Sequence, residues 1–237
     1  MGRECWTPLA PPRCCPHDPV IREAPPTAFT GKVQTTELAS GTALSRVHLA
    51  AYGSTEFNPV QADIRFGGGR FDGTDLDPYP FAYFGESDHV AVAEALLRDV
   101  PADDRGARFL AKRYWTGRQI SRVELTQEAK MVDLRSGPAL GAIGQDTWLT
   151  TCGPEDYPQT RSWAEWLRIE APDAHGITWL SKREPGAEVY VFFGDRTAAG
   201  ALTGVAGPVA GDAPFDKDQG FAWLKATLAT YRVSIRK

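Results

Sequence analysis

Cysteine is scarce and unevenly placed in this chain, which excludes a disulfide-stapled secreted domain. Of 237 residues four are cysteines: Cys5, Cys14 and Cys15 crowd the first fifteen positions, and Cys152 stands alone. A disulfide framework needs more cysteines in a more even arrangement. His17 lies near the N-terminal group, but the spacing lacks the paired short gaps of a structural zinc site. We therefore expect no bound metal.

The chain also lacks a long apolar run and an excess of positive charge. No segment offers the roughly 18 apolar residues of a membrane span. The N-terminal stretch MGRECWTPLAPPRCCPHDP places prolines and charges where a signal peptide needs an apolar run. The net charge of −4 gives no general attraction to nucleic acid or to an anionic membrane. We expect a cytoplasmic protein that binds neither directly, so any phosphate recognition must come from a local group of cations.

What the chain does have is length and apolar content for one good core. Its hydrophobic fraction is 42%, with seven tryptophans and eleven phenylalanines, which suits a soluble globular protein. Seven prolines mark residues 1–30 as an irregular N-terminal arm. Residues 31–196 are the expected main domain, and 197–237 combine an Ala/Gly-rich linker over 197–213 with a closing amphipathic helix.

Hydrophobic periodicity predicts both strands and helices in this domain. The expected strands are 44–51, 81–84, 120–125, 130–134, 176–181 and 188–194, and the expected helices are 87–100, 159–170 and 217–230. The third and fourth strands are expected to form a hairpin across a short polar connection. Pro185-Gly186 predicts a second hairpin between the fifth and sixth.

One carboxylate lies in an unusual position. In the first expected helix, apolar residues recur at spacings of three and four, and Ser87 or Asp88 is placed to cap it. Glu94 follows Val90 by four residues, so its carboxylate is expected to project from the apolar face, away from the side that Arg98 occupies. A carboxylate on an apolar face is costly unless it is paired or used. Glu94 is therefore either a catalytic group or one partner of a structural ion pair.

Cations and glycines lie upstream of that helix. The segment FGGGRFDG delivers Arg70 on a Gly-rich turn, where backbone can approach a ligand without intervening side chains. Arg46 and His48 alternate onto one face of their strand, and Ser181 ends an otherwise apolar row. On spacing alone each has an ordinary structural interpretation as a turn, an exposed strand face or a strand-end serine.

The order and spacing of these pieces resemble the RES-domain family, which is named for its Arg, Glu and Ser. The matching segments are SRVH, FNP, GGRFD, FAYFGES, AVAEALLRDVP, HGITWLSKRE and VFFGDR, which together cover about residues 44–196. No single segment is specific, yet their order makes the match strong. The resemblance maps the family's Arg, Glu and Ser to Arg46, Glu94 and Ser181. Its Gly-Arg-aromatic motif and the tyrosine before the helix fall on Gly69, Arg70, Phe71 and Tyr83.

The resemblance implies an α/β (α+β) fold of mixed, mostly antiparallel sheets flanked by helices, similar to the ADP-ribosyltransferase toxins. It also implies NAD+ as the substrate, consumed by cleavage of its nicotinamide–ribose bond without a metal. The implied catalytic residues are Glu94, Arg46 and Ser181. The NAD+-binding set is Arg46, Gly69, Arg70, Tyr83 and Ser181, to which this chain adds Arg65, an arginine close to Arg70.

The resemblance leaves the acceptor of the ADP-ribosyl group open. Water makes the enzyme an NAD+ glycohydrolase, phosphate makes it an NAD+ phosphorylase, and a protein side chain makes it an ADP-ribosyltransferase. A catalytically degenerate module that binds a nucleotide or a partner is the non-enzymatic alternative. Many family members are toxins of toxin–antitoxin pairs. Since this chain has no recognisable helix-turn-helix of its own, the implied partner is a separate Xre-like antitoxin that blocks the cleft. Homo-oligomerisation stays open.

Overall fold

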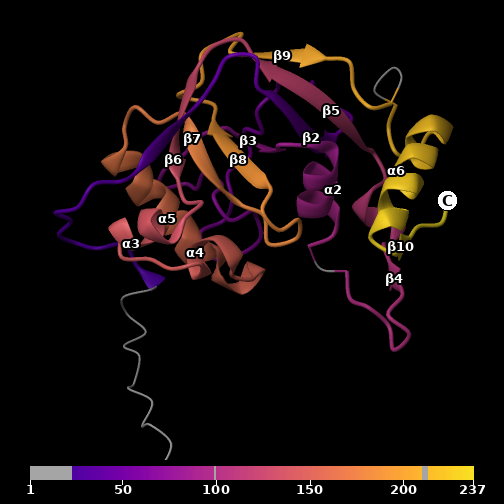
Figure 1. The fold of residues 1–237 in the computed structure, drawn as a ribbon, viewed down its shortest axis with the longest axis horizontal. Coiled ribbons are helices and arrows are strands. Elements are labelled where there is room, and N and C mark those ends of the chain that lie inside the picture. Colours follow the sequence, from indigo (N-terminus) through magenta and orange to yellow (C-terminus); the bar gives the residue numbers. More distant parts are fainter. Residues whose placement is uncertain (1–22, 99, 210–212) are drawn as a thin grey trace, which may run out of the picture.

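Eight strands form one curled sheet in the computed structural model, which describes residues 23–98, 100–209 and 213–237 (Figure 1). In sheet order the strands are β1 (Thr35–Leu38), β6 (Ala129–Asp133), β7 (Gly176–Leu180), β8 (Glu188–Phe193), β3 (Phe81–Gly85), β2 (Ala43–Leu49), β5 (Arg118–Leu125) and β9 (Leu202–Val205). Within this sheet β6 and β7 pair in parallel and the other neighbours pair antiparallel. The prediction of a mixed, mostly antiparallel α+β fold is confirmed.

The sheet turns a corner where β1 leads into β2 and, beside it, β5 leads into β6. The β1–β6 ladder, from Thr35↔Val132 onward, and the β2–β5 ladder, which ends at Leu49↔Arg118, keep the same register on the two sides of the corner. A backbone bond from Gly41 to the carbonyl of Leu125 joins them at 2.7 Å. The predicted hairpin between 120–125 and 130–134 is therefore wrong. The two strands do not pair with each other: β5 pairs with β2, and β6 pairs with β1. The β7–β8 hairpin is confirmed.

The helices gather at the two ends of the molecule (Figure 1). One end holds α3 (Gly137–Ala142), α4 (Trp148–Thr151) and α5 (Tyr157–Glu170), with a 3-10 turn over Pro154–Asp156. The other holds α6 (Asp218–Thr230), a 3-10 turn over Lys112–Tyr114 and the small parallel pair of β4 (Arg108–Phe109) and β10 (Val233–Ser234), while α2 (Asp88–Leu96) lies between this end and the middle of the sheet (Figure 1). The predicted helices near 159–170 and 217–230 are confirmed. The segment predicted as a linker, 197–213, contains β9.

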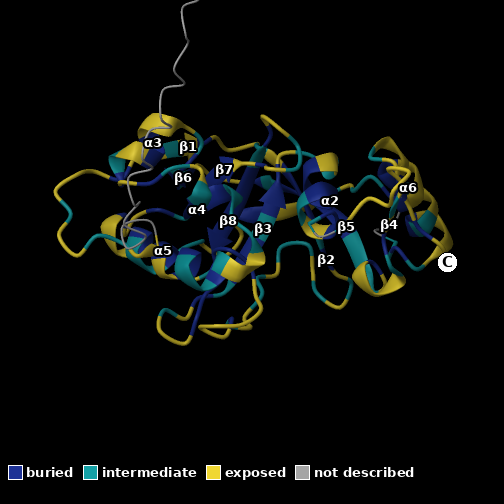
Figure 2. Ribbon diagram, turned by 90° about the horizontal axis from the view of Figure 1, so that it is seen from below, coloured by how far each residue is buried: buried dark blue, intermediate teal, exposed yellow. Residues whose placement is uncertain are grey.

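Buried side chains form three clusters, and Figure 2 shows their strands dark against the exposed outer faces of the helices. One cluster packs α5, through Trp163, on the sheet. A second joins α2 to α6 around Trp115 and Phe215. The third combines Leu38 of β1 with Leu202 of β9, the two edge strands. Because residues of both edge strands pack into one cluster, the sheet is curled around that cluster. The helices pack on the opposite face of the sheet.

Helix α2 lies between two of these clusters. The Ser87 hydroxyl caps it by accepting from the backbone N–H of Val90, whose side chain joins the α5 cluster, whereas Leu96 joins the α6 cluster. The helix ends at Leu96, earlier than predicted, and the carbonyl of Arg98 beyond it accepts from Arg183 Nη2 at 3.2 Å. Burial on two sides fixes the direction in which the polar residues of α2 point.

Candidate active site

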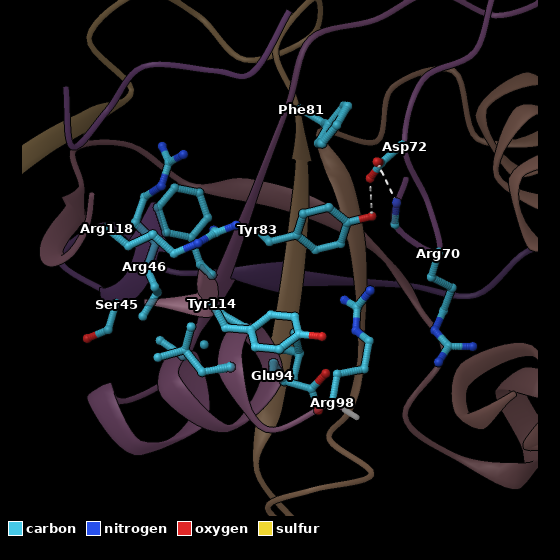
Figure 3. A pocket seen from close by; sticks show the side chains of 18 of the residues that line it. Ser45, Arg46, Arg70, Asp72, Phe81, Tyr83, Glu94, Arg98, Tyr114 and Arg118 are labelled. Atoms are coloured by element: carbon cyan, nitrogen blue, oxygen red, sulfur yellow. Dashed lines mark hydrogen bonds between the residues drawn. The ribbon is translucent and has the colours of Figure 1, made fainter. Parts of the chain in front are cut away.

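A cavity of about 450 Å³ opens between α2, the strands β2, β3 and β5, the Gly-rich turn and the start of α5. Most of the predicted site residues lie around it (Figure 3). Its wall includes Ser45, Arg46, Gly69, Arg70, Asp72, Tyr83, Glu94, Arg98, Tyr114, Arg118, Tyr157 and Trp179. Ser181 lies behind Glu94 and bonds to it. Arg65 is exposed and does not line the cavity.

The carboxylate of Glu94 is held by one short hydrogen bond and one loose ion pair. Ser181 Oγ donates to Glu94 Oε1 at 2.6 Å, and Arg183 Nη1 lies 3.5 Å from Oε2. The Glu94 side chain keeps 19% of its surface exposed. Ser181 Oγ also accepts the backbone N–H groups of Arg183 and Glu184, at 3.0 and 2.9 Å. Since these bonds use the hydroxyl fully, Ser181 orients Glu94 through Oε1, and Oε2 has only the loose contact with Arg183.

The Gly-rich turn is closed by a buried polar network. Tyr83 Oη donates to Asp72 Oδ1 at 2.7 Å and accepts the Phe71 N–H at 2.9 Å, while Asp72 Oδ2 accepts the Gly69 N–H at 2.6 Å (Figure 3). Burial raises the pKa of both Asp72 and Tyr83. A Cβ on Gly69 would meet Asp72 Oδ1 at 2.6 Å, so this close approach requires glycine. The Tyr83 hydroxyl is committed to the turn, and its ring faces the cavity.

Two of the predicted cations are bound by backbone carbonyls. Arg70 donates to the carbonyls of Leu149 and Cys152, at 3.2 and 3.0 Å, and to Cys152 Sγ at 2.7 Å. Arg46, 7% exposed, donates through Nη1 to the carbonyls of Ser54 and Glu56. Desolvation lowers the pKa of Arg46 to about 10. Both arginines line the cavity, yet much of their donor capacity serves the fold, and their roles toward NAD+ stay predictions.

His48 lies beside Arg46 and is neutral. Its Nδ1 lies 3.0 Å from the Leu49 carbonyl, which can only accept, so Nδ1 carries the proton and Nε2 accepts from Ser121 Oγ at 2.9 Å. Burial, and secondarily the charge of Arg46, lowers the pKa of His48 to about 4. This histidine supports strand β2 and has no part in the cavity wall.

The sequence did not single out several wall residues. Asp72 follows Gly69 by three residues, a spacing that favours a side-chain bond to the turn backbone and could have indicated it. Arg98 was expected on the side away from Glu94, and this was wrong. It follows Glu94 by four residues, which places both side chains on the same cavity. No local signal marked Tyr114 or Arg118, since the chain reaches the wall there only through its tertiary fold.

The described part of the chain offers neither a metal site nor a membrane-spanning helix. Within it, no group of three or more His, Cys, Asp or Glu side chains is placed to hold a metal ion. The N-terminal cysteines and His17 lie outside the described residues. No helix among the described residues combines the length and apolar character needed to cross a membrane.

Comparison with known proteins identifies the family. The sequence model of the RES domain family matches residues 43–218. This span includes the matching segments from SRVH to VFFGDR. No curated protein matches the chain. Among solved structures, it is similar to a chain of the M. tuberculosis MbcT-MbcA toxin-antitoxin complex, with 17% identity and a TM-score of 0.48, over 72% of this chain and 84% of that one. The chain described here belongs to the RES domain family.

Proposed function

We propose that this protein degrades NAD+ by cleaving its nicotinamide–ribose bond, with water or phosphate as the acceptor. The observation that carries the proposal is the Glu94 carboxylate, which Ser181 fixes at 2.6 Å on the wall of an arginine-lined cavity. A cavity of about 450 Å³ is within the range of sites that take cofactors and small ligands. The family resemblance supplies the substrate class.

One oriented carboxylate is enough for this chemistry. The C1′–N bond breaks with its electron pair going to the nicotinamide nitrogen, so the cationic ring leaves as a neutral molecule and needs no general acid. The positive charge that develops on the ribose is stabilised by the carboxylate, whose effect is greatest in the transition state. Water then adds at C1′ and loses a proton to solvent, whereas phosphate adds to give a phosphorylated ADP-ribose. A pair of carboxylates, as most glycosidases use, is not required.

The residues around Glu94 support this role. Ser181 holds Oε1, so the oxygen that the loose Arg183 contact leaves available is Oε2. The rings of Tyr83 and Trp179 form apolar walls on which a flat ring can pack. The side chain of Ser181, fully bonded within the protein, acts on the substrate through Glu94.

We also propose that the protein acts as a toxin whose partner is a separate helix-turn-helix antitoxin. The family contains many such toxins, and the cavity is open to a partner that covers it. Expressed alone, the chain should deplete cellular NAD+ and arrest growth, and the Glu94→Gln variant should do neither. Normal growth and normal NAD+ levels in cells that contain the folded wild-type protein would contradict the toxin role.

The enzymatic proposal is tested with the purified full chain and NAD+, with and without inorganic phosphate. Chromatography measures nicotinamide release, and mass spectrometry identifies the other product as ADP-ribose or its phosphorylated form. Added protein that gains the mass of ADP-ribose would instead indicate the transferase alternative. A folded protein that binds NAD+ but releases no nicotinamide under any of these conditions would contradict the proposal and favour the binding module.

A further inference from the structure

Four arginines line the cavity, and they fall into two pairs with different partners. Arg46 and Arg70 donate to backbone carbonyls. The guanidinium groups of Arg98 and Arg118 make no hydrogen bond and no ion pair within residues 23–98, 100–209 and 213–237. An arginine whose planar set of N–H donors is unused on a cavity wall can take a ligand oxygen without breaking a protein bond.

Neighbouring residues hold the Arg98 side chain at the cavity wall. Its Cζ lies 5.3 Å from the ring centroid of Tyr157, a cation–π contact that supports the side chain without using its N–H groups. Figure 3 shows the side chain extended between Glu94 and Tyr83. The carbonyl of Arg98 accepts from Arg183, the residue that also pairs with Glu94. The backbone of Arg98 is thus tied to the same support as the proposed catalytic carboxylate.

Arg118 lies at the start of β5, and Figure 3 shows it on the side of the cavity away from Arg98. Its carbonyl accepts from the backbone N–H of Phe215, which fixes the main chain. Desolvation lowers the pKa of Arg118, and no acidic group of the described residues is paired with it. A partly desolvated cation without a counter-ion is costly, and a bound anion removes that cost.

The net charge of the cavity wall also favours an anionic ligand. Among the described residues, the charged side chains of the wall are the four arginines and two carboxylates, Asp72 and Glu94, which leaves an excess of two positive charges. The complete chain has a net charge of −4. In addition, Arg46 Nε is buried and has no partner among the described residues. A cavity that concentrates positive charge in an acidic protein is suited to an anionic ligand.

We propose that Arg98 and Arg118 bind the diphosphate of a nucleoside diphosphate ligand, whereas Arg46 and Arg70 shape the cavity wall. The proposal rests on the proposed function for the identity of the complete ligand, NAD+. The diphosphate itself follows from the chemistry of the wall, because two free guanidinium groups can each form paired hydrogen bonds with phosphate oxygens. Both residues are therefore binding residues of the site, and Arg98 lines the same cavity beside Glu94 (Figure 3).

The test uses ADP, which has the diphosphate but no nicotinamide, and measures its affinity for the full chain by calorimetry. Arg98→Gln and Arg118→Gln should each weaken ADP binding at least tenfold and leave adenosine binding unchanged. Arg105→Gln is the charge-matched control, since Arg105 is exposed and outside the cavity, and it should bind ADP as the wild type does. Wild-type affinity for ADP in either cavity variant overturns the assignment of that arginine.

A second measurement uses the wild-type protein, so it remains decisive if a variant fails to fold. In the wild-type protein, the side-chain Nε–H resonances of Arg98 and Arg118 should shift when ADP is added, while that of Arg105 stays in place. Resonances of Arg98 and Arg118 that do not respond at saturating ADP overturn the proposal. Because ADP is not cleaved, this result is independent of turnover: bound ADP without nicotinamide release rejects the proposed function alone, and release with unresponsive arginines rejects this inference alone.

Discussion

The two walls of the cavity differ in how completely their polar groups are used. On the glycine-turn wall, Tyr83, Asp72 and Arg70 are bonded to one another or to backbone. On the helix wall, Glu94 has one firm partner and the Arg98 side chain has no hydrogen-bond partner in the described residues. Groups with satisfied hydrogen bonds maintain a shape, whereas groups with unused capacity are available to a ligand. The difference agrees with our proposal that the glycine-turn wall is scaffold and the helix wall carries the chemistry.

The largest effect on stability is expected at the scaffold. Arg161, 2% exposed, donates to four carbonyls of the loop that carries the glycine turn, those of Asp63, Ile64, Gly67 and Gly69. Arg161→Gln cannot reproduce these bonds, and we expect it to lower the free energy of unfolding by about 3 kcal/mol. Urea denaturation measures this loss.

A control within the same loop separates charge from hydrogen bonding. Arg65 is exposed, so Arg65→Gln should change the unfolding free energy by less than about 0.5 kcal/mol. Equal stability losses in the Arg161 and Arg65 variants would show that the loop responds to net charge, and the scaffold role of this wall would be lost.

A pH effect of similar size is expected at His48. Its pKa in the folded protein is about 4, below the ordinary value of about 6.5, so the unfolded chain takes up the proton first as the pH falls. Stability is fully present above about pH 6.5 and declines toward pH 4, by at most about 3 kcal/mol. His48→Gln should flatten the stability curve in that window, whereas His89→Gln, at an exposed position, should not. An unchanged slope in His48→Gln would contradict this assignment.

A smaller effect is expected when the helix wall loses its support. Ser181→Ala removes the 2.6 Å bond to Glu94, and misplacement of a catalytic group costs about ten- to a hundredfold in rate. We expect nicotinamide release to fall about tenfold, with the affinity for ADP unchanged. Ser162→Ala, at an exposed hydroxyl on α5, is the matched control. A proportional loss of ADP affinity would show that Ser181 contacts the ligand and does not act through Glu94.

Local patterns were enough to predict the helix wall in outline. The cap at Ser87, the apolar spacing of α2 and the anomalous carboxylate at Glu94 are all neighbours in sequence, and the structure places them as a capped helix facing a cavity. Alternation likewise located β2, β3, β7 and β8 to within a few residues. The family resemblance then related these pieces to one fold.

Long-range pairing accounts for what the sequence did not predict. The carbonyl partners of Arg70 lie about 80 residues further along the chain, in and after α4, so no local pattern showed that this arginine is occupied. The corner in the sheet replaced the expected hairpin because residues 126–128 pass alongside 39–42. The inward direction of Arg98 depends on how α2 ends, and helix ends are set by tertiary contacts such as that with Arg183.

The central claim is that the Glu94 charge serves catalysis and not stability. The most direct test measures the melting temperature and the rate of nicotinamide release on one sample of Glu94→Gln. Glutamine keeps the size and hydrogen-bonding capacity of glutamate but removes the charge that the ribosyl cation needs. We therefore predict a melting temperature near that of the wild type and a rate lower by about a hundred- to a thousandfold. A destabilised variant with normal activity per folded molecule would show that Glu94 is a structural partner of Arg183 and would contradict the account.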